Sequence, residues 1–160
     1  MKILGIDPGT SRIGYGLINS GNNLKLIDCG LIEIFDKSIS KFSSLADRFE
    51  KLIKKTNPDL VALEKIYFAR NQKTAIEVAQ ARGILILLTL QNKIRLIEYG
   101  PVEIKQAVTG YGLADKKSVA KMVSRILKID KIKGPDDISD AVAIAITAAV
   151  RYNPINQLNQ

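Results

Sequence analysis

ILGIDPGTSRIGYGLI, residues 3–18, consists of two apolar runs separated by a short polar turn. This pattern predicts two strands, over residues 2–7 and 15–19, joined by the turn PGTSRIG. Asp7 ends a strand that is otherwise apolar, and burying an unpaired charge is costly. The carboxylate therefore needs a cation, a hydrogen-bond network or a ligand, unless it only starts an Asp-Pro-Gly turn.

The remaining chain predicts alternating strands and helices. Strands are expected at residues 26–35, 60–65 and 93–99, and helices at about 40–55, 73–91, 102–108, 116–128 and 136–151. This order predicts an α/β fold with a mixed five-stranded sheet, in which three antiparallel strands are followed by parallel additions, with helices on both faces. We expect a single domain over residues 1–152 and a frayed tail over 153–160.

Composition narrows the class of protein. The 160 residues are 46% hydrophobic, which argues against disorder. No segment reads as a signal peptide or reaches the roughly 20 apolar residues that span a bilayer, so we expect a cytoplasmic protein without membrane contact. There is one cysteine and no histidine, which excludes an internal disulfide and the usual Cys/His zinc sites. Any bound metal must therefore be held by oxygen.

The basic charge of the chain is concentrated in one region. The formal net charge is +8, and residues 105–133 carry eight lysines and arginines but only two aspartates. A basic surface can serve solubility alone, but a focused basic region favours a polyanionic partner. Nucleic acid is preferred over a membrane, because no basic amphipathic segment carries large exposed apolar anchors.

Three further acids resemble Asp7 in their setting. Glu64 ends the apolar strand LVALEK, although it could be an exposed strand end beside Lys65. In GPDDISDAVAIAITAA, Asp137 and Asp140 are three residues apart and share one helix face. Acids in a first turn also favour the helix dipole, and Asp136 satisfies that explanation by itself. The helix dipole does not explain Asp140, which lies past the first turn.

We therefore expect the four carboxylates of Asp7, Glu64, Asp137 and Asp140 to converge. Four such anions cannot all stay ionised without cations, and hard oxygen ligands select Mg²⁺, with Mn²⁺ as a substitute. With no histidine base, a metal would have to activate the attacking water. Two ions roughly 3.5–4 Å apart could hold the attacking and leaving oxygens of a phosphodiester.

Several motifs together resemble the RuvC family of Holliday-junction resolvases, from about residue 2 to 150. They are GIDPGTSRIGYGLI, VALEKIYFARN, QARGI, EYGPVEIKQAVTGYGLADKKSV and DDISDAVAIAITAA, in that order. The resemblance implies an RNase H-like nuclease fold and a homodimer. It implies an enzyme that cuts two opposing strands of a four-way DNA junction symmetrically, with Mg²⁺, in recombination and repair. The RuvA and RuvB branch-migration proteins are implied as partners.

The resemblance also assigns site residues. It makes Asp7, Glu64, Asp137 and Asp140 the catalytic metal ligands, with Asp136 a neighbour. The third family position can be histidine, so Asp137 implies an all-carboxylate site.

Lys105 and Lys116 match family lysines near the scissile phosphates, where a cation can neutralise charge that develops in the transition state. Tyr67 matches an aromatic residue that stacks on bases, and Phe68 beside it is expected in the core unless it takes that role. One of Lys116 and Lys117 could instead belong to a solvated helix start. The expected DNA-binding set is Tyr67, Phe68, Arg70, Lys117, Lys121 and Arg125.

Some alternatives stay open. RNA-processing nucleases of the same fold also begin with an Asp-Pro-Gly turn. GIDPGTSRIGYGLI further resembles the phosphate loop of sugar kinases and actin-like ATPases, but those enzymes need a second lobe that 160 residues do not provide. A non-catalytic junction-binding protein would not need four acids in a DNA groove. The helix TAIEVAQARGILILL is a candidate dimer element or an ordinary sheet-packing helix.

Overall fold

A mixed five-stranded sheet forms the centre of the computed structural model, which describes residues 1–36, 38–66 and 72–152. The strand order is β3-β2-β1-β4-β5. The strands are β1 (Lys2–Asp7), β2 (Arg12–Ser20), β3 (Leu24–Glu33), β4 (Leu60–Glu64) and β5 (Arg95–Tyr99). β1, β2 and β3 pair antiparallel, whereas β4 joins β1 and β5 joins β4 in parallel. The predicted sheet is thus confirmed.

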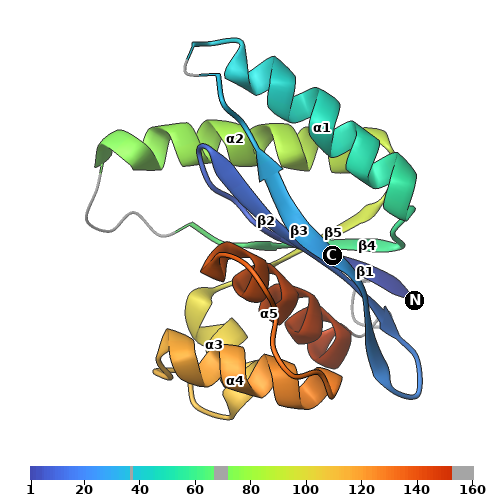
Figure 1. The fold of residues 1–160 in the computed structure, drawn as a ribbon. Coiled ribbons are helices and arrows are strands. Elements are labelled where there is room, and N and C mark those ends of the chain that lie inside the picture. The colour runs from blue at the N-terminus through green and yellow to red at the C-terminus, as the bar shows by residue number, and fades with distance from the viewer. Residues whose placement is uncertain (37, 67–71, 153–160) are drawn as a thin grey trace, which may run out of the picture.

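Helices cover both faces of this sheet, as predicted (Figure 1). They are α1 (Lys41–Thr56), α2 (Gln72–Gln91), α3 (Pro101–Thr109), α4 (Lys116–Leu127) and α5 (Asp136–Arg151). α1 and α2 lie on one face, and α5 lies on the other with α3 and α4 packed beside it. In the described part of the chain, no helix is long and apolar enough to cross a bilayer.

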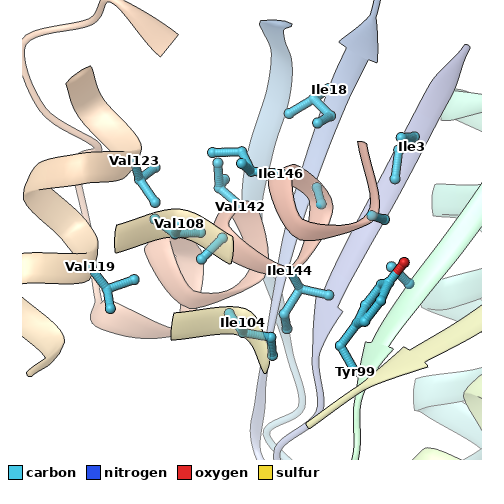
Figure 2. Packing of buried hydrophobic residues seen from close by; sticks show 14 of the residues in the cluster. Ile3, Ile18, Tyr99, Ile104, Val108, Val119, Val123, Val142, Ile144 and Ile146 are labelled. Carbon is cyan, nitrogen blue, oxygen red and sulfur yellow. The ribbon is translucent and has the colours of Figure 1, made fainter. Parts of the chain in front are cut away.

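The core is divided by the sheet into two clusters, as the alternation of side chains along a strand requires. Ile3 of β1 belongs to the cluster under α5, together with Ile144 and Ile146 of that helix (Figure 2). Leu4 and Ile6 belong to the cluster under α1 and α2. β1 is therefore fixed from both faces, and this rigid strand carries Asp7 at its end.

Several element boundaries differ from the predictions. β2 begins at Arg12 rather than residue 15, because the backbone around Gly14 pairs with both β1 and β3 and needs no apolar side-chain pattern. β3 covers Leu24–Glu33 instead of 26–35. β5 begins only at Arg95, since Lys93 has a left-handed backbone (φ 58°) that interrupts a strand. Residues 153–160, predicted to fray, lie outside the described residues.

Candidate active site

The carboxylates of Asp7 and Glu64 stand at the same edge of the sheet. β1 and β4 are neighbouring parallel strands in which Ile6 pairs with Leu63, so each strand ends one residue later on an acid. Ile6 and Leu63 are fully buried, whereas both acids are partly exposed. The structure therefore presents two of the predicted acids side by side at the surface of the core.

Close packing of α5 on the sheet brings in the other two acids. A side chain at Gly5 of β1 would collide with the backbone of Ala141, and one at Gly14 of β2 would collide with the carbonyl of Asp137. Because glycine has only a hydrogen atom in place of a side chain, the helix backbone can lie directly on the strands at these two positions. Because the contact falls on the first turns of α5, Asp137 and Asp140 come to the edge that holds Asp7.

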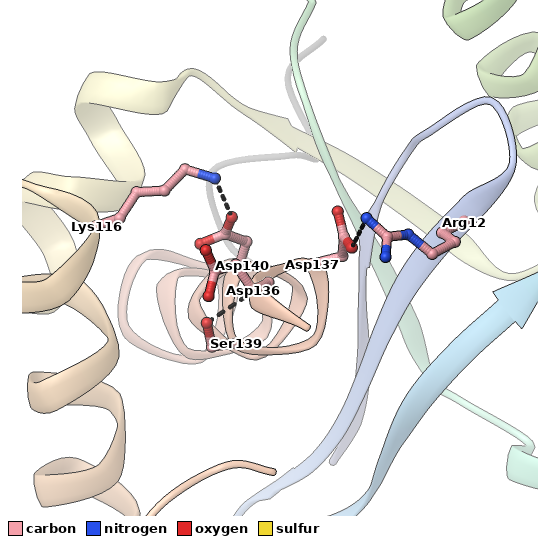
Figure 3. A network of polar contacts seen from close by, with 6 residues as sticks. All are labelled: Arg12, Lys116, Asp136, Asp137, Ser139 and Asp140. Atoms are coloured by element: carbon pink, nitrogen blue, oxygen red, sulfur yellow. Dashed lines mark hydrogen bonds and ion pairs between the residues drawn. The ribbon is translucent and has the colours of Figure 1, made fainter. Parts of the chain in front are cut away.

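Two cations pair with the acids of α5 (Figure 3). Lys116, the first residue of α4, donates from Nζ to Oδ2 of Asp140 at 3.1 Å. Arg12, in the first position of β2, pairs through Nη2 with Oδ2 of Asp137 at 3.5 Å. Sequence reasoning missed Arg12, although a basic residue in the turn directly after Asp7 was an available signal.

Electrostatics couples the acids into one cluster. The pKa of Asp7 rises from 3.8 to about 7. The largest cause is burial, which disfavours the charged form, followed by the negative charges of Glu64, Asp140 and Asp137. Burial and the charge of Asp140 also raise the pKa of Glu64. The positive charge of Lys116 opposes both increases.

A cavity of about 300 Å³ opens at this edge of the sheet. Asp7, Glu64 and Asp140 line it together with Lys105 of α3 and Lys116 of α4. Its other walls are apolar, and they consist of Pro101, Ile104, Val119, Ala143 and Ile144. An acidic floor, two lysines and apolar walls make a site for a charged substrate that is partly shielded from water. Asp137 does not line the cavity.

The donor set fits a hard divalent cation. The acidic side chains at this site are all carboxylates, and burial together with neighbouring negative charges raises the pKa values of Asp7 and Glu64, so a bound cation would favour their charged forms. Within residues 1–36, 38–66 and 72–152, no three acidic side chains are arranged as a complete ligand set. Two of the four acids are instead engaged by Lys116 and Arg12. Metal binding would therefore compete with these ion pairs.

Comparison with known proteins identifies the family. The family model described as crossover junction endodeoxyribonuclease RuvC matches residues 3–148. The chain belongs to the RuvC family. The RuvC of Thermosipho melanesiensis is 45% identical over 154 residues, which cover 94% of this chain and 98% of that protein. The RuvC of Caldicellulosiruptor saccharolyticus is 44% identical over 151 residues, 91% of this chain and 90% of that protein.

Solved structures agree with this assignment. The structure of Thermus thermophilus RuvC is similar with a TM-score of 0.85 and 28% identity, covering 94% of each chain. The same protein in complex with a Holliday junction substrate is similar with a TM-score of 0.83 and 27% identity, over 94% of this chain and 93% of that one. The RNase H-like fold expected from the sequence is confirmed, and the RNA-processing and kinase alternatives are not favoured.

The predicted DNA-binding residues fall into two groups. Lys117, Lys121 and Arg125 are exposed along α4, which begins at the active-site cavity with Lys116. Tyr67, Phe68 and Arg70 lie outside the described residues. Asp136, predicted to be a neighbour of the ligands, is exposed, and its carbonyl accepts a hydrogen bond from the Ser139 hydroxyl.

Proposed function

We propose that this protein is a structure-selective endonuclease that resolves Holliday junctions by nicking two opposing strands with the help of Mg²⁺. The observation that carries the proposal is the convergence of Asp7, Glu64 and Asp140 with Lys105 and Lys116 around one cavity. Membership of the RuvC family and the junction complex of a structural neighbour support the substrate.

Asp7, Glu64, Asp137 and Asp140 are the residues that would hold Mg²⁺ or Mn²⁺, and we predict two ions in each site. Bound metal supplies the positive charge that activates the attacking water and stabilises the leaving oxygen of a phosphodiester. The protein's own contribution is position, because β1, β4 and α5 fix the four carboxylates on three rigid elements. Asp137 does not line the cavity, and its ion pair with Arg12 holds it beside the other acids.

Lys105 and Lys116 act on the substrate phosphate. Both line the cavity, and in the described part of the chain Lys105 forms no ion pair, so its charge is available. A lysine near the scissile phosphate stabilises the negative charge that builds up on its oxygens in the transition state. Lys116, which pairs with Asp140 here, would be free to do the same if Asp140 held a metal. Ile104 and Val119 contribute buried apolar side chains to the wall of the same cavity.

A homodimer is proposed to place two such sites on one junction, with α2 as the interface helix. Arg82 of α2 points to the sheet, where it pairs with Glu98 of β5. The opposite side of α2 carries Ile76, Leu87 and Leu90, which are 55–62% exposed. Gly83 lies between them with nothing within 4 Å of where a side chain would be. An apolar stripe with a small residue at its centre suits the close approach of a second α2. RuvA and RuvB as partners stay a prediction.

The direct test compares a synthetic four-way DNA junction with a linear duplex of the same sequence, in Mg²⁺ and in EDTA. Paired, symmetric nicks that need Mg²⁺ and occur only in the junction are expected. Binding without cleavage would instead favour a non-catalytic junction-binding protein. Cleavage of an RNA control would favour an RNA-processing nuclease.

A further inference from the structure

A second cavity, of about 600 Å³, lies beside the active site between α4, the loop after it and the first turn of α5. We call it the α4–α5 groove. Its charged lining residues are Lys121, Arg125, Lys128, Asp130, Lys131 and Asp136. Four of these six are basic, so the groove has the charge of an anion-binding site.

The basic side chains of the groove are unpaired. Among the described residues, none of the four forms an ion pair, even though Asp130 and Asp136 line the same cavity. Lys121 and Arg125 are four residues apart on one exposed side of α4, and Lys128 follows as the residue that caps the C-terminus of the helix. Like charges four residues apart on a helix, such as those of Lys121 and Arg125, disfavour each other. Four positive charges gathered around one groove favour a ligand with several negative charges in a row.

The groove continues the active site. Asp136 and Ser139 line the groove, while Asp140 of the next turn lines the acidic cavity. Lys116 at the start of α4 reaches Asp140 (Figure 3), and residues of α4 line both cavities. Lys121 to Lys128 span about 10 Å at 1.5 Å per residue. The groove is therefore long enough to follow consecutive backbone phosphates of one strand.

We propose that the α4–α5 groove binds the backbone phosphates of the cut strand that directly follow the scissile phosphate on one side. This inference rests on the proposed nuclease function and deepens it by giving the path of the strand. Lys128 and Lys131 join the predicted contacts Lys121 and Arg125. Such contacts read no base sequence, and they fix the register of the strand so that one phosphate lies over the acids.

The first experiment measures junction affinity against salt concentration. Arg125→Gln and Lys131→Gln remove one charge each from exposed positions, and Lys54→Gln removes an exposed lysine of α1 on the opposite face of the sheet. All three are made in Asp7→Asn protein and measured in EDTA, so that no cleavage interferes. Each groove variant is expected to lower the slope of log affinity against log salt by about one, whereas the control leaves it unchanged. Unchanged melting temperatures show that all variants are folded.

The second experiment replaces single phosphates of the cut strand by neutral methylphosphonates, up to three positions on either side of the cleavage site. If Arg125 or Lys131 contacts a phosphate, neutralising that phosphate weakens binding of the parent Asp7→Asn protein but not of the matching variant. This difference between the parent protein and the variant is expected only for phosphates on one side of the cut. The proposal would be overturned if each methylphosphonate weakened binding equally in the parent protein and in the variants. It would also be overturned if the groove variants had the same salt slope as Lys54→Gln.

The wild-type protein is assayed for junction cleavage in the same series. Mg²⁺-dependent cleavage without any coupling would reject the groove and leave the nuclease function standing. Failure of the wild-type protein to cut the junction would reject the proposed function itself.

Discussion

Replacing Asp7 by asparagine is expected to stabilise the protein when no divalent metal is present and the pH is above 7. In the wild-type protein, this carboxylate is partly buried and faces Glu64 and Asp140, which raises its pKa to about 7. An acid with a raised pKa stabilises the folded state while it is protonated, and this contribution is lost as the pH rises through the folded pKa. Asparagine is neutral at every pH and avoids the loss.

The magnitude follows from the pKa. A change from 3.8 to about 7 corresponds to about 4 kcal/mol, at about 1.4 kcal/mol for each pKa unit. The full effect develops between pH 3.8 and about 7, and about 3 kcal/mol of it falls between pH 5 and pH 8. The free energy of unfolding of wild type, relative to Asp7→Asn, is therefore expected to decrease by about 3 kcal/mol over that range.

Urea unfolding in EDTA at pH 5 and pH 8 measures this difference. Asp47→Asn, an exposed change on α1, serves as the control and should follow wild type at both values. Added Mg²⁺ should stabilise wild type more than Asp7→Asn, because a ligand of the metal is missing in the variant. If the free energies of unfolding of wild type and Asp7→Asn changed in parallel with pH, Asp7 would not be held in a destabilising cluster of anions.

Three further predictions address catalysis, assembly and packing. Lys105→Ala and Lys116→Ala should each slow single-turnover junction cleavage by about 100-fold and weaken binding far less; equal losses in rate and affinity would place these lysines in binding alone. Leu87→Glu should give a monomer in analytical ultracentrifugation and lose paired nicking, whereas an intact dimer would move the interface away from α2. Gly5→Ala should lower the free energy of unfolding in urea by about 3 kcal/mol, because α5 occupies the space. Gly21→Ala, with nothing within 4 Å, is its control and should change stability by less than about 1 kcal/mol.

Much of the fold could be predicted because its strands and helices differ clearly in periodicity. The buried runs of residues 3–6 and 60–63 needed only local patterns, and the acids at their ends stand out against them. The beginning of β2 could not be predicted in the same way. Its first residues, Arg12 and Ile13, are held by backbone pairing with β3, and Gly14 pairs with both β1 and β3 and contacts α5. These backbone contacts leave no side-chain pattern.

The candidate site was only partly predictable. Its acids could be found, because a carboxylate at the end of an apolar strand or beside an apolar helix run is a local anomaly. The pairing of Arg12 with Asp137 and of Lys116 with Asp140 depends on how α5 and α4 dock on the sheet. Such docking joins residues more than 20 positions apart in the sequence, and no local pattern encodes it. The α4–α5 groove arises in the same way.

Single-turnover cleavage of a four-way junction by Asp7→Asn, at protein concentrations that saturate binding, tests the central claim most directly. If the four acids form one metal-dependent site, the variant should bind the junction like wild type and leave it uncut in Mg²⁺. Cleavage at the wild-type rate would contradict the assignment of Asp7, and with it the site built around β1, β4 and α5.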